Sequence, residues 1–246
     1  LPTQYILYIG NLAKGDLGRS YRTNRPIAEE IAERWPATLK LALASLFVAM
    51  VIGVPVGVLA ATHRGTIADT LPMIGAFVGI SMPSFWLGLV LIIIFSVRLK
   101  ILPFVGFDNA LNYVLPSLTL GFGIAANIAR LTRASMLEVL GQDYIRTARG
   151  KGLAETSVIY LHALRNASVP IVTIIGLQLG SLLGGQVVTE TVFSWPGIGR
   201  MIVDALGKRD LPLVQGGILV LALTFVLTNC VVDILYGVLD PRIRLR

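Results

Sequence analysis

The segment from Asp143 to Gly152 has the most distinctive spacing of charged and small residues in this 246-residue sequence. If it forms a helix that begins near Gln142, then Ile145, Ala148 and Gly152 make one small, apolar stripe. The polar and charged residues of the segment are Asp143, Tyr144, Arg146, Thr147 and Arg149, and the two arginines lie around the other side. Such a helix suits a groove of a partner protein and an anionic lipid surface equally well.

Other reactive side chains do not gather into a catalytic or metal-binding set. The two histidines, His63 and His162, are far apart, and the single cysteine, Cys230, excludes an internal disulfide and a cysteine-based metal cluster. The sequence contains no GxxxxGK[ST] phosphate-binding loop, so any ATP must be hydrolysed on another subunit. We therefore expect that this chain is not an enzyme and has no catalytic residue, cofactor or metal of its own.

Long apolar runs must position these polar groups. Hydrophobic residues make up 54% of the chain and charged residues only 14%, against roughly a quarter charged in soluble domains. A membrane-spanning helix needs about 20 mostly apolar residues. Five runs meet this length with some tilt, at about residues 36–61, 71–97, 113–128, 169–192 and 211–239. They predict an all-α polytopic membrane protein with five transmembrane helices, and the net charge of +7 then suits lipid headgroups better than nucleic acid.

The polar segments suggest how the chain is organised. Residues 1–35 form a polar segment with a short helix started at Pro26, residues 36–246 form the transmembrane domain, and residues 137–168 form its longest loop. The distribution of Lys and Arg mildly favours a cytoplasmic C-terminus and loop, which places Leu1 outside. Because the sequence has neither an initiator Met nor an export signal, we expect a sixth, upstream helix that is missing here.

A few polar residues near the spans are candidates for function. Gln178, Gln186, Glu190 and Trp195 are possible pore or gate residues. The alternative for the two glutamines is that they only form hydrogen bonds between helices. The alternative for Glu190 is that it is solvated or bonded to a loop, and the alternative for Trp195 is that it lies at the membrane interface. Asp233 is expected to form a structural ion pair with Arg130 or Arg133, and the glycines at 176, 180 and 184 are expected to permit close helix packing.

The segment at 143–165 also resembles the signature loop of ABC-importer permeases. That signature is Glu-Ala-Ala, three residues, Gly, nine residues, then Ile-x-Leu-Pro. Ala148, Gly152 and Leu164 match it, whereas Arg146 and Arg165 stand in the places of the Glu and the Pro. The divergent form resembles the peptide, nickel and glutathione branch of these importers. The resemblance extends over DYIRTARGKG, HALRNA, ETVFSWPGIGRMIVDAL, RDLPLVQGG, VVDILYGVLDPRIR and KGDLGRSYRTNRPI.

The resemblance implies a type I importer permease in the bacterial inner membrane, with an additional first helix. It implies that residues 143–152 form a coupling helix that docks on a cytoplasmic ATPase. Expected partners are a second permease, two ATPases that carry ATP and Mg²⁺, and an external solute-binding protein. Short peptides, glutathione or a nickel complex would be the cargo. The alternative is a secondary transporter or channel without an ATPase, but the inverted repeats and mid-membrane charges typical of that class are not visible.

Overall fold

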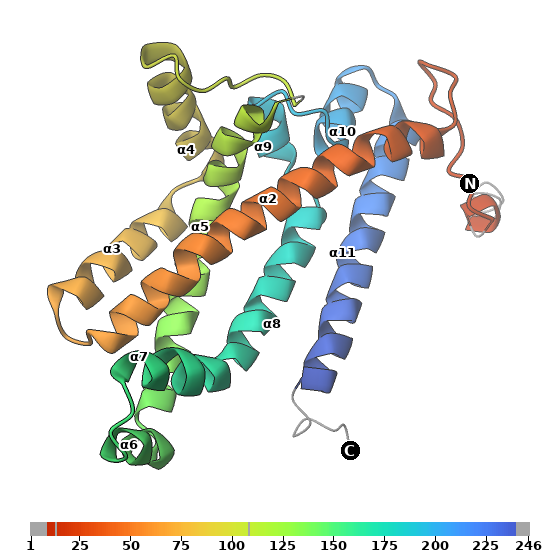
Figure 1. Ribbon diagram of the computed structural model, residues 1–246. Coiled ribbons are helices and arrows are strands. Elements are labelled where there is room, and N and C mark those ends of the chain that lie inside the picture. The colour runs from red at the N-terminus through yellow and green to blue at the C-terminus, as the bar shows by residue number, and fades with distance from the viewer. Residues whose placement is uncertain (1–8, 13, 108, 240–246) are drawn as a thin grey trace.

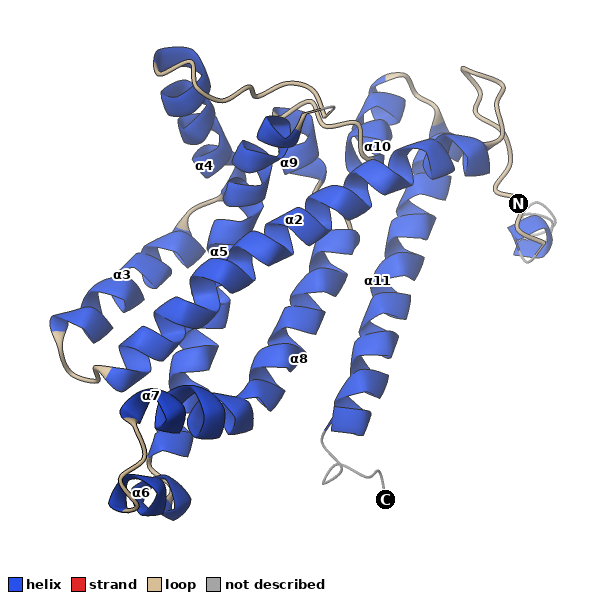
Figure 2. Ribbon diagram, viewed as in Figure 1, coloured by secondary structure: helices blue, strands red, loops and turns tan. Residues whose placement is uncertain are grey.

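The computed structural model of the protein describes residues 9–12, 14–107 and 109–239. Over these residues the chain is helical and contains no strand, as Figure 2 shows, which confirms the predicted all-α class. The elements are α2 (Ile27–Thr62), α3 (Ile67–Ser81), α4 (Ser84–Leu91), the π-helix η1 (Ile92–Arg98), α5 (Ala110–Leu140), α6 (Asp143–Gly150), α7 (Glu155–Ser157), the π-helix η2 (Val158–Ala163), α8 (Leu164–Leu183), α9 (Val187–Val192), α10 (Ile198–Gly207) and α11 (Leu211–Leu239).

Four of the described helices are long and apolar enough to cross a membrane. They are α2, α5, the α7–α8 segment and α11. The predicted second span, residues 71–97, is not a straight helix, because α3 and the α4–η1 segment meet at an angle of 104°. Pro83 explains the break, since the residue before a proline is pushed into an extended conformation, and Met82 adopts one. The bent pair is the fifth candidate span.

Helix α2 is longer than the sequence indicated. The short helix expected after Pro26 and the first apolar run form one continuous helix from Ile27 to Thr62, which Pro36 does not interrupt. The predicted boundary between residues 35 and 36 therefore falls inside this helix. Helix α5 is also longer than its apolar run and continues to Leu140.

Helices α2 and α5 lie in close contact along their length. A Cβ atom added to Gly53 would lie 2.7 Å from the carbonyl oxygen of Ala125, and one added to Gly57 would lie 2.6 Å from that of Ala129. Small residues of this kind let two helix backbones approach each other within a membrane. The α2–α5 pair is the centre of the bundle, and α3 and α8 pack around it (Figure 1).

Helix α8 ends earlier than the predicted fourth span. It stops at Leu183, and Gly185 adopts a φ of +109°, a conformation that favours glycine and turns the chain into the short helix α9. The expected close packing of the glycines is confirmed. A Cβ atom at Gly176 would lie 2.7 Å from Val232, and one at Gly180 would lie 2.5 Å from Asn229 Oδ1, both on α11.

The bundle has two different ends (Figure 1). Helices α6 and α7 and the last described turn of α11 lie at one end, which we name the α6 end. Helices α4, α9 and α10 and the starts of α2 and α11 lie at the other, the α10 end. At the α10 end, the amphipathic helix α10 buries Ile198, Met201 and Ile202 against Ile27 and Leu213.

The α2–α5 contact generates a stability prediction. We expect Gly57→Ala to cost about 1–3 kcal/mol of unfolding free energy, because its Cβ would lie 2.5 Å from Thr132 Cβ in a contact with no room to relax. The matched control is Gly75→Ala in α3, where a Cβ meets nothing within 4 Å. Thermal unfolding of the detergent-solubilised protein measures both. Equal unfolding temperatures for the two variants would contradict the close contact.

Candidate functional site

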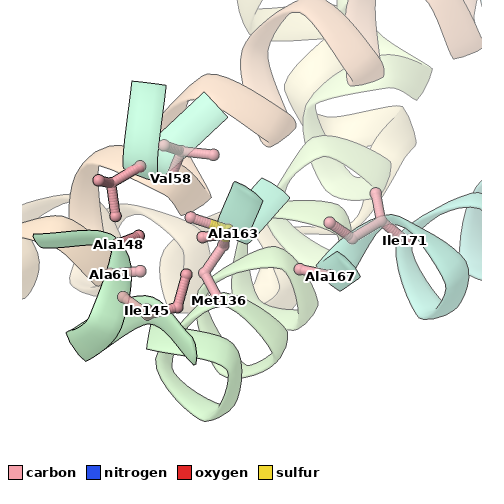
Figure 3. Close-up of a cluster of buried hydrophobic side chains, with 9 residues drawn as sticks. Val58, Ala61, Met136, Ile145, Ala148, Ala163, Ala167 and Ile171 are labelled. Carbon is pink, nitrogen blue, oxygen red and sulfur yellow. The ribbon is translucent and has the colours of Figure 1, made fainter. Parts of the chain in front are cut away.

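Helix α6 forms where the sequence predicts it, directly after Gln142. Its apolar stripe faces its own bundle, since Ile145 is 0% exposed and Ala148 only 8%. Both belong to a buried cluster at the α6 end, drawn in Figure 3. The other members of the cluster come from α2, α5, η2 and α8, and they are Val58, Ala61, Met136, Val158, Ala163, Ala167 and Ile171. This subunit covers Ile145 and Ala148, so these two side chains are not available for direct contact with a partner in this structure. Docking through the rest of the segment stays a prediction.

The polar residues of α6 point away from the bundle and are free to meet a partner. Tyr144 is 42% exposed, and Asp143, Arg146, Thr147 and Arg149 are exposed as well. Gly152 is also exposed and has a φ of +77° that favours glycine. The helix thus has a buried apolar side that fixes its position and an outer side that is polar and mostly basic.

Two side-chain interactions fix α6 relative to the helices that follow it. Arg149 donates to both carboxylate oxygens of Glu155, at 3.1 and 2.6 Å, across the turn that contains Gly152. Asn166 Nδ2, in the first turn of α8, donates to the hydroxyl oxygen of Tyr144 at 2.9 Å. These contacts and the buried cluster connect α6 to the beginning of α8.

Glu190 and Trp195, two of the candidates for the pore or gate, are both 0% exposed. The Glu190 carboxylate accepts hydrogen bonds from Thr38 Oγ1 at 2.9 Å and from the backbone N–H of Arg200 at 3.0 Å. Trp195 Nε1 donates to the carbonyl of Ala37 at 2.9 Å. Both side chains therefore connect α2, α9 and α10 inside the subunit, and their role in a pore or gate stays a prediction. Glu190 is therefore neither solvated nor bonded to a loop, because its side chain is buried and its donors belong to α2 and to the first turn of α10.

Gln178 and Gln186, the other two candidates, are brought together. Both line one cavity of about 150 Å³ between the bend of α3 and α4, helix α5 and the end of α8. They do not share a helix face, however, because α8 ends at Leu183 and Gln186 directly precedes α9. The cavity places the two amides on a polar wall within the bundle.

The expected ion pair of Asp233 is wrong. Arg133 instead forms a two-point ion pair with Asp69 of α3, with Nε–Oδ1 and Nη2–Oδ2 distances of 2.5 and 2.7 Å. Arg130 and Asp233 are exposed, and neither forms an ion pair within the described part of the chain. The pair follows from the packing of α3 against α5, which the positions of charges along the sequence do not indicate.

Asp210 is a buried polar group that the sequence analysis missed. It accepts hydrogen bonds from Ser20 Oγ at 2.5 Å and from the N–H of Tyr21 at 3.1 Å, and it caps α11 through the N–H of Leu213. It thereby holds the segment before α2 against the start of α11. An Asp directly before a helix is a cap signal, and the pattern Asp-Leu-Pro at 210–212 could have identified it.

Comparison with known proteins identifies the chain. Residues 53–245 match the family described as "Binding-protein-dependent transport system inner membrane component". The chain belongs to this family. It is 51% identical over 241 residues to the glutathione transport system permease protein GsiC of Escherichia coli O6:H1, strain CFT073, and 50% identical to GsiC of strain K12. Each alignment covers 98% of this chain and 79% of the relative.

Solved structures of ABC importers share the fold. An inward-facing form of the MetNI methionine ABC transporter aligns with a TM-score of 0.70 over 85% of this chain and 96% of that one, at 20% identity. An amino acid ABC transporter aligns with a TM-score of 0.63 over 88% of this chain and 95% of that one, at 13% identity. At these identities, the likeness supports the type I permease fold alone.

Family and fold together establish the class of the protein. It is a permease subunit of an ABC importer and crosses the bacterial inner membrane several times. Its relatives are transport subunits, and the alternative of a secondary transporter or channel no longer applies.

The Asp210 contacts generate a prediction about pH. Burial alone would raise the pKa of Asp210, but the hydrogen bonds from Ser20 and the backbone amides outweigh it and hold the pKa below its ordinary value. Because its pKa is lower in the folded state, the ionised Asp210 carboxylate stabilises the fold at pH values above its unfolded-state pKa of about 3.9. This stabilisation is lost as the pH falls through the folded-state pKa.

We therefore expect Asp210→Asn to lower the unfolding temperature at pH 7, and the difference from the original protein to shrink as the pH falls below about 4. Thermal unfolding in detergent across this pH range measures it. Asp204→Asn, at an exposed position of α10, is the control and should change little. A difference for Asp210→Asn that is the same at every pH would contradict the prediction.

Proposed function

We propose that this chain forms half of the pathway through which an ABC importer brings glutathione or a related short peptide into the cell. The observation that supports this cargo is the identity of 50–51% over 98% of the chain to permeases named for glutathione transport. The peptide, nickel and glutathione branch expected from the loop at 143–165 is consistent with it.

The proposed assembly contains a second, homologous permease and two ATPase subunits that bind ATP and Mg²⁺. The family description supports an extracytoplasmic binding protein as a further partner. The absence of a phosphate-binding loop from the sequence supports separate ATPases, because such a loop holds the phosphates of ATP in this class of motor.

In this proposal, α6 is the coupling helix and the α6 end is cytoplasmic. The last described turn of α11 lies at the same end (Figure 1), which supports the proposal that the chain leaves α11 on the cytoplasmic side. The α10 end is then external, together with the segment before α2, and it is the surface available to the binding protein. The Lys and Arg distribution favours the same orientation.

The geometry of α6 suits the transmission of movement from an ATPase. Its exposed face, with Tyr144 and Arg146, meets the ATPase, whereas Ile145 and Ala148 are packed in the cluster at the base of the bundle. Displacement of α6 therefore moves the start of α8 through this cluster and through the Tyr144–Asn166 hydrogen bond. Helix α8 carries Gln178, so the movement reaches the polar cavity.

The cargo is tested with the complete importer reconstituted in liposomes together with its binding protein. We expect that uptake of radiolabelled glutathione requires both ATP and the binding protein. We also expect that an excess of unlabelled short peptides reduces this uptake. An ATP-dependent uptake of a nickel complex without any uptake of glutathione would contradict the proposed cargo. Uptake of glutathione that is independent of ATP would contradict the proposed mechanism.

The role of α6 is tested by Gly152→Leu. We expect the amount of cargo taken up per ATP hydrolysed to fall by at least about tenfold. The backbone of Gly152 is left-handed, and a leucine side chain there strains it and shifts the surface through which α6 contacts the ATPase. Gly65→Leu is the matched control, since Gly65 has the same φ of +77° and the same free space but lies in the turn between α2 and α3, whereas Gly152 lies in the turn that directly follows α6. Equal coupling in the two variants would argue against docking through α6.

A further inference from the structure

The cavity that contains Gln178 and Gln186 is lined by uncharged groups. Its hydrogen-bonding side chains come from α4, α5, α8 and the residue before α9, and they are Ser84, Thr119, Gln178, Ser181 and Gln186. Glycine and apolar side chains complete the wall, and none of the described residues that line it carries a charge. This composition differs from both ends of the bundle, where buried acids are bound by nearby donors.

Most of the polar side chains in the cavity are not used within the subunit. Thr119 Oγ1 donates to the carbonyl of Leu115 at 2.8 Å, and Gln186 Nε2 makes a long contact of 3.4 Å with the carbonyl of Ser181. In the described part of the chain, the side chains of Ser84, Gln178 and Ser181 have no hydrogen-bond partner. The Gln178 amide thus offers both a donor and an acceptor at the cavity wall.

The lining restricts the chemistry of a ligand. Removing a carboxylate or ammonium group from water without an opposite charge is strongly unfavourable, so charged groups are poorly suited to this wall. A neutral group with one N–H and one carbonyl oxygen matches a glutamine amide, which can pair with both. The peptide bond is such a group.

The bend between α3 and α4 makes the room for this ligand. The two helices diverge by 104° at Met82 and Pro83, and Gly79 and Gly123 form part of the wall beside them. The volume of about 150 Å³ is close to that of an engineered cavity, of about 150 Å³, that binds benzene. One residue-sized portion of a peptide fits, but a whole tripeptide does not.

We infer that this cavity is a subsite for one peptide bond of the cargo, which pairs with the Gln178 amide during passage. The inference rests on the proposed function and specifies which part of the cargo the permease contacts. Because the contact is made to the backbone, the subsite accepts peptides with different side chains and excludes solutes that lack an amide.

A chemical double-mutant cycle tests the pairing. The complete importer with its binding protein is reconstituted with the original chain or with Gln178→Leu, which keeps the volume and removes the hydrogen-bonding groups. Each importer is given glutathione and two analogues, each methylated at one peptide nitrogen and so lacking that N–H. We expect at least one analogue to be imported less well by the original importer, and Gln178→Leu to reduce this preference roughly three- to tenfold.

The cycle separates the subsite from the rest of the transporter. Preferences of the binding protein cancel, because the same binding protein is present in every measurement. Gln215→Leu is the control, since it makes the same chemical change at an exposed position of α11 that is not part of the cavity. The importer with Gln215→Leu should prefer glutathione over each analogue to the same degree as the original importer does.

Two results would overturn the inference. If importers with Gln178→Leu and with the original chain show the same preference for glutathione over each of the two analogues, the proposed subsite is wrong and the proposed function is unaffected. A lack of ATP-dependent glutathione uptake by the original importer would overturn the proposed function and the subsite together. If Gln178→Leu fails to assemble, Gln178→Met is the second variant, since its unbranched side chain also lacks the amide, and an unaltered preference there also overturns the subsite.

Discussion

The close approach of α2 and α5 is the contact on which the other helices depend. Lipid chains are as apolar as leucine, so helices associate in a membrane through fit rather than through the hydrophobic effect. Gly53 and Gly57 supply that fit, because each lacks a side chain at the point where a backbone carbonyl of α5 approaches α2. The pair then provides one continuous wall. At the α6 end this wall presents Val58 and Met136 to α6, and at the α10 end the start of α2 packs on α10.

This arrangement explains why a short polar helix can have a fixed position outside the apolar bundle. Helix α6 spans only eight residues and would be marginal alone. Burial of Ile145 and Ala148 supplies the stability that its own hydrogen bonds do not. Since the cluster also contains residues of η2 and α8, α6 is packed against the start of α8. A rigid connection of this kind is the physical requirement for transmitting movement from a partner subunit.

The sequence predicted those features that depend on local patterns. The apolar runs located the spans, and the spacing of Ile145 and Ala148 located α6. Neighbours across the bundle were not predictable, which is why Asp233 was paired with Arg130 or Arg133 when α3 instead presents Asp69 to Arg133. Periodicity also does not tell which side of a helix is covered by its own subunit, so the burial of Glu190 and Trp195 was missed.

Charge is distributed in a way that bears on selectivity. Each buried acid described here is bound by donors of its own subunit, as Asp69 is by Arg133, Glu190 by Thr38 and Asp210 by Ser20. These acids hold helices together and leave no charge at the cavity wall among the described residues. A cavity without charge disfavours charged groups of both signs and therefore cannot distinguish positively from negatively charged peptide side chains. Discrimination of that kind must therefore arise elsewhere in the importer, and a binding protein that meets the cargo first, in water, can supply it at lower desolvation cost.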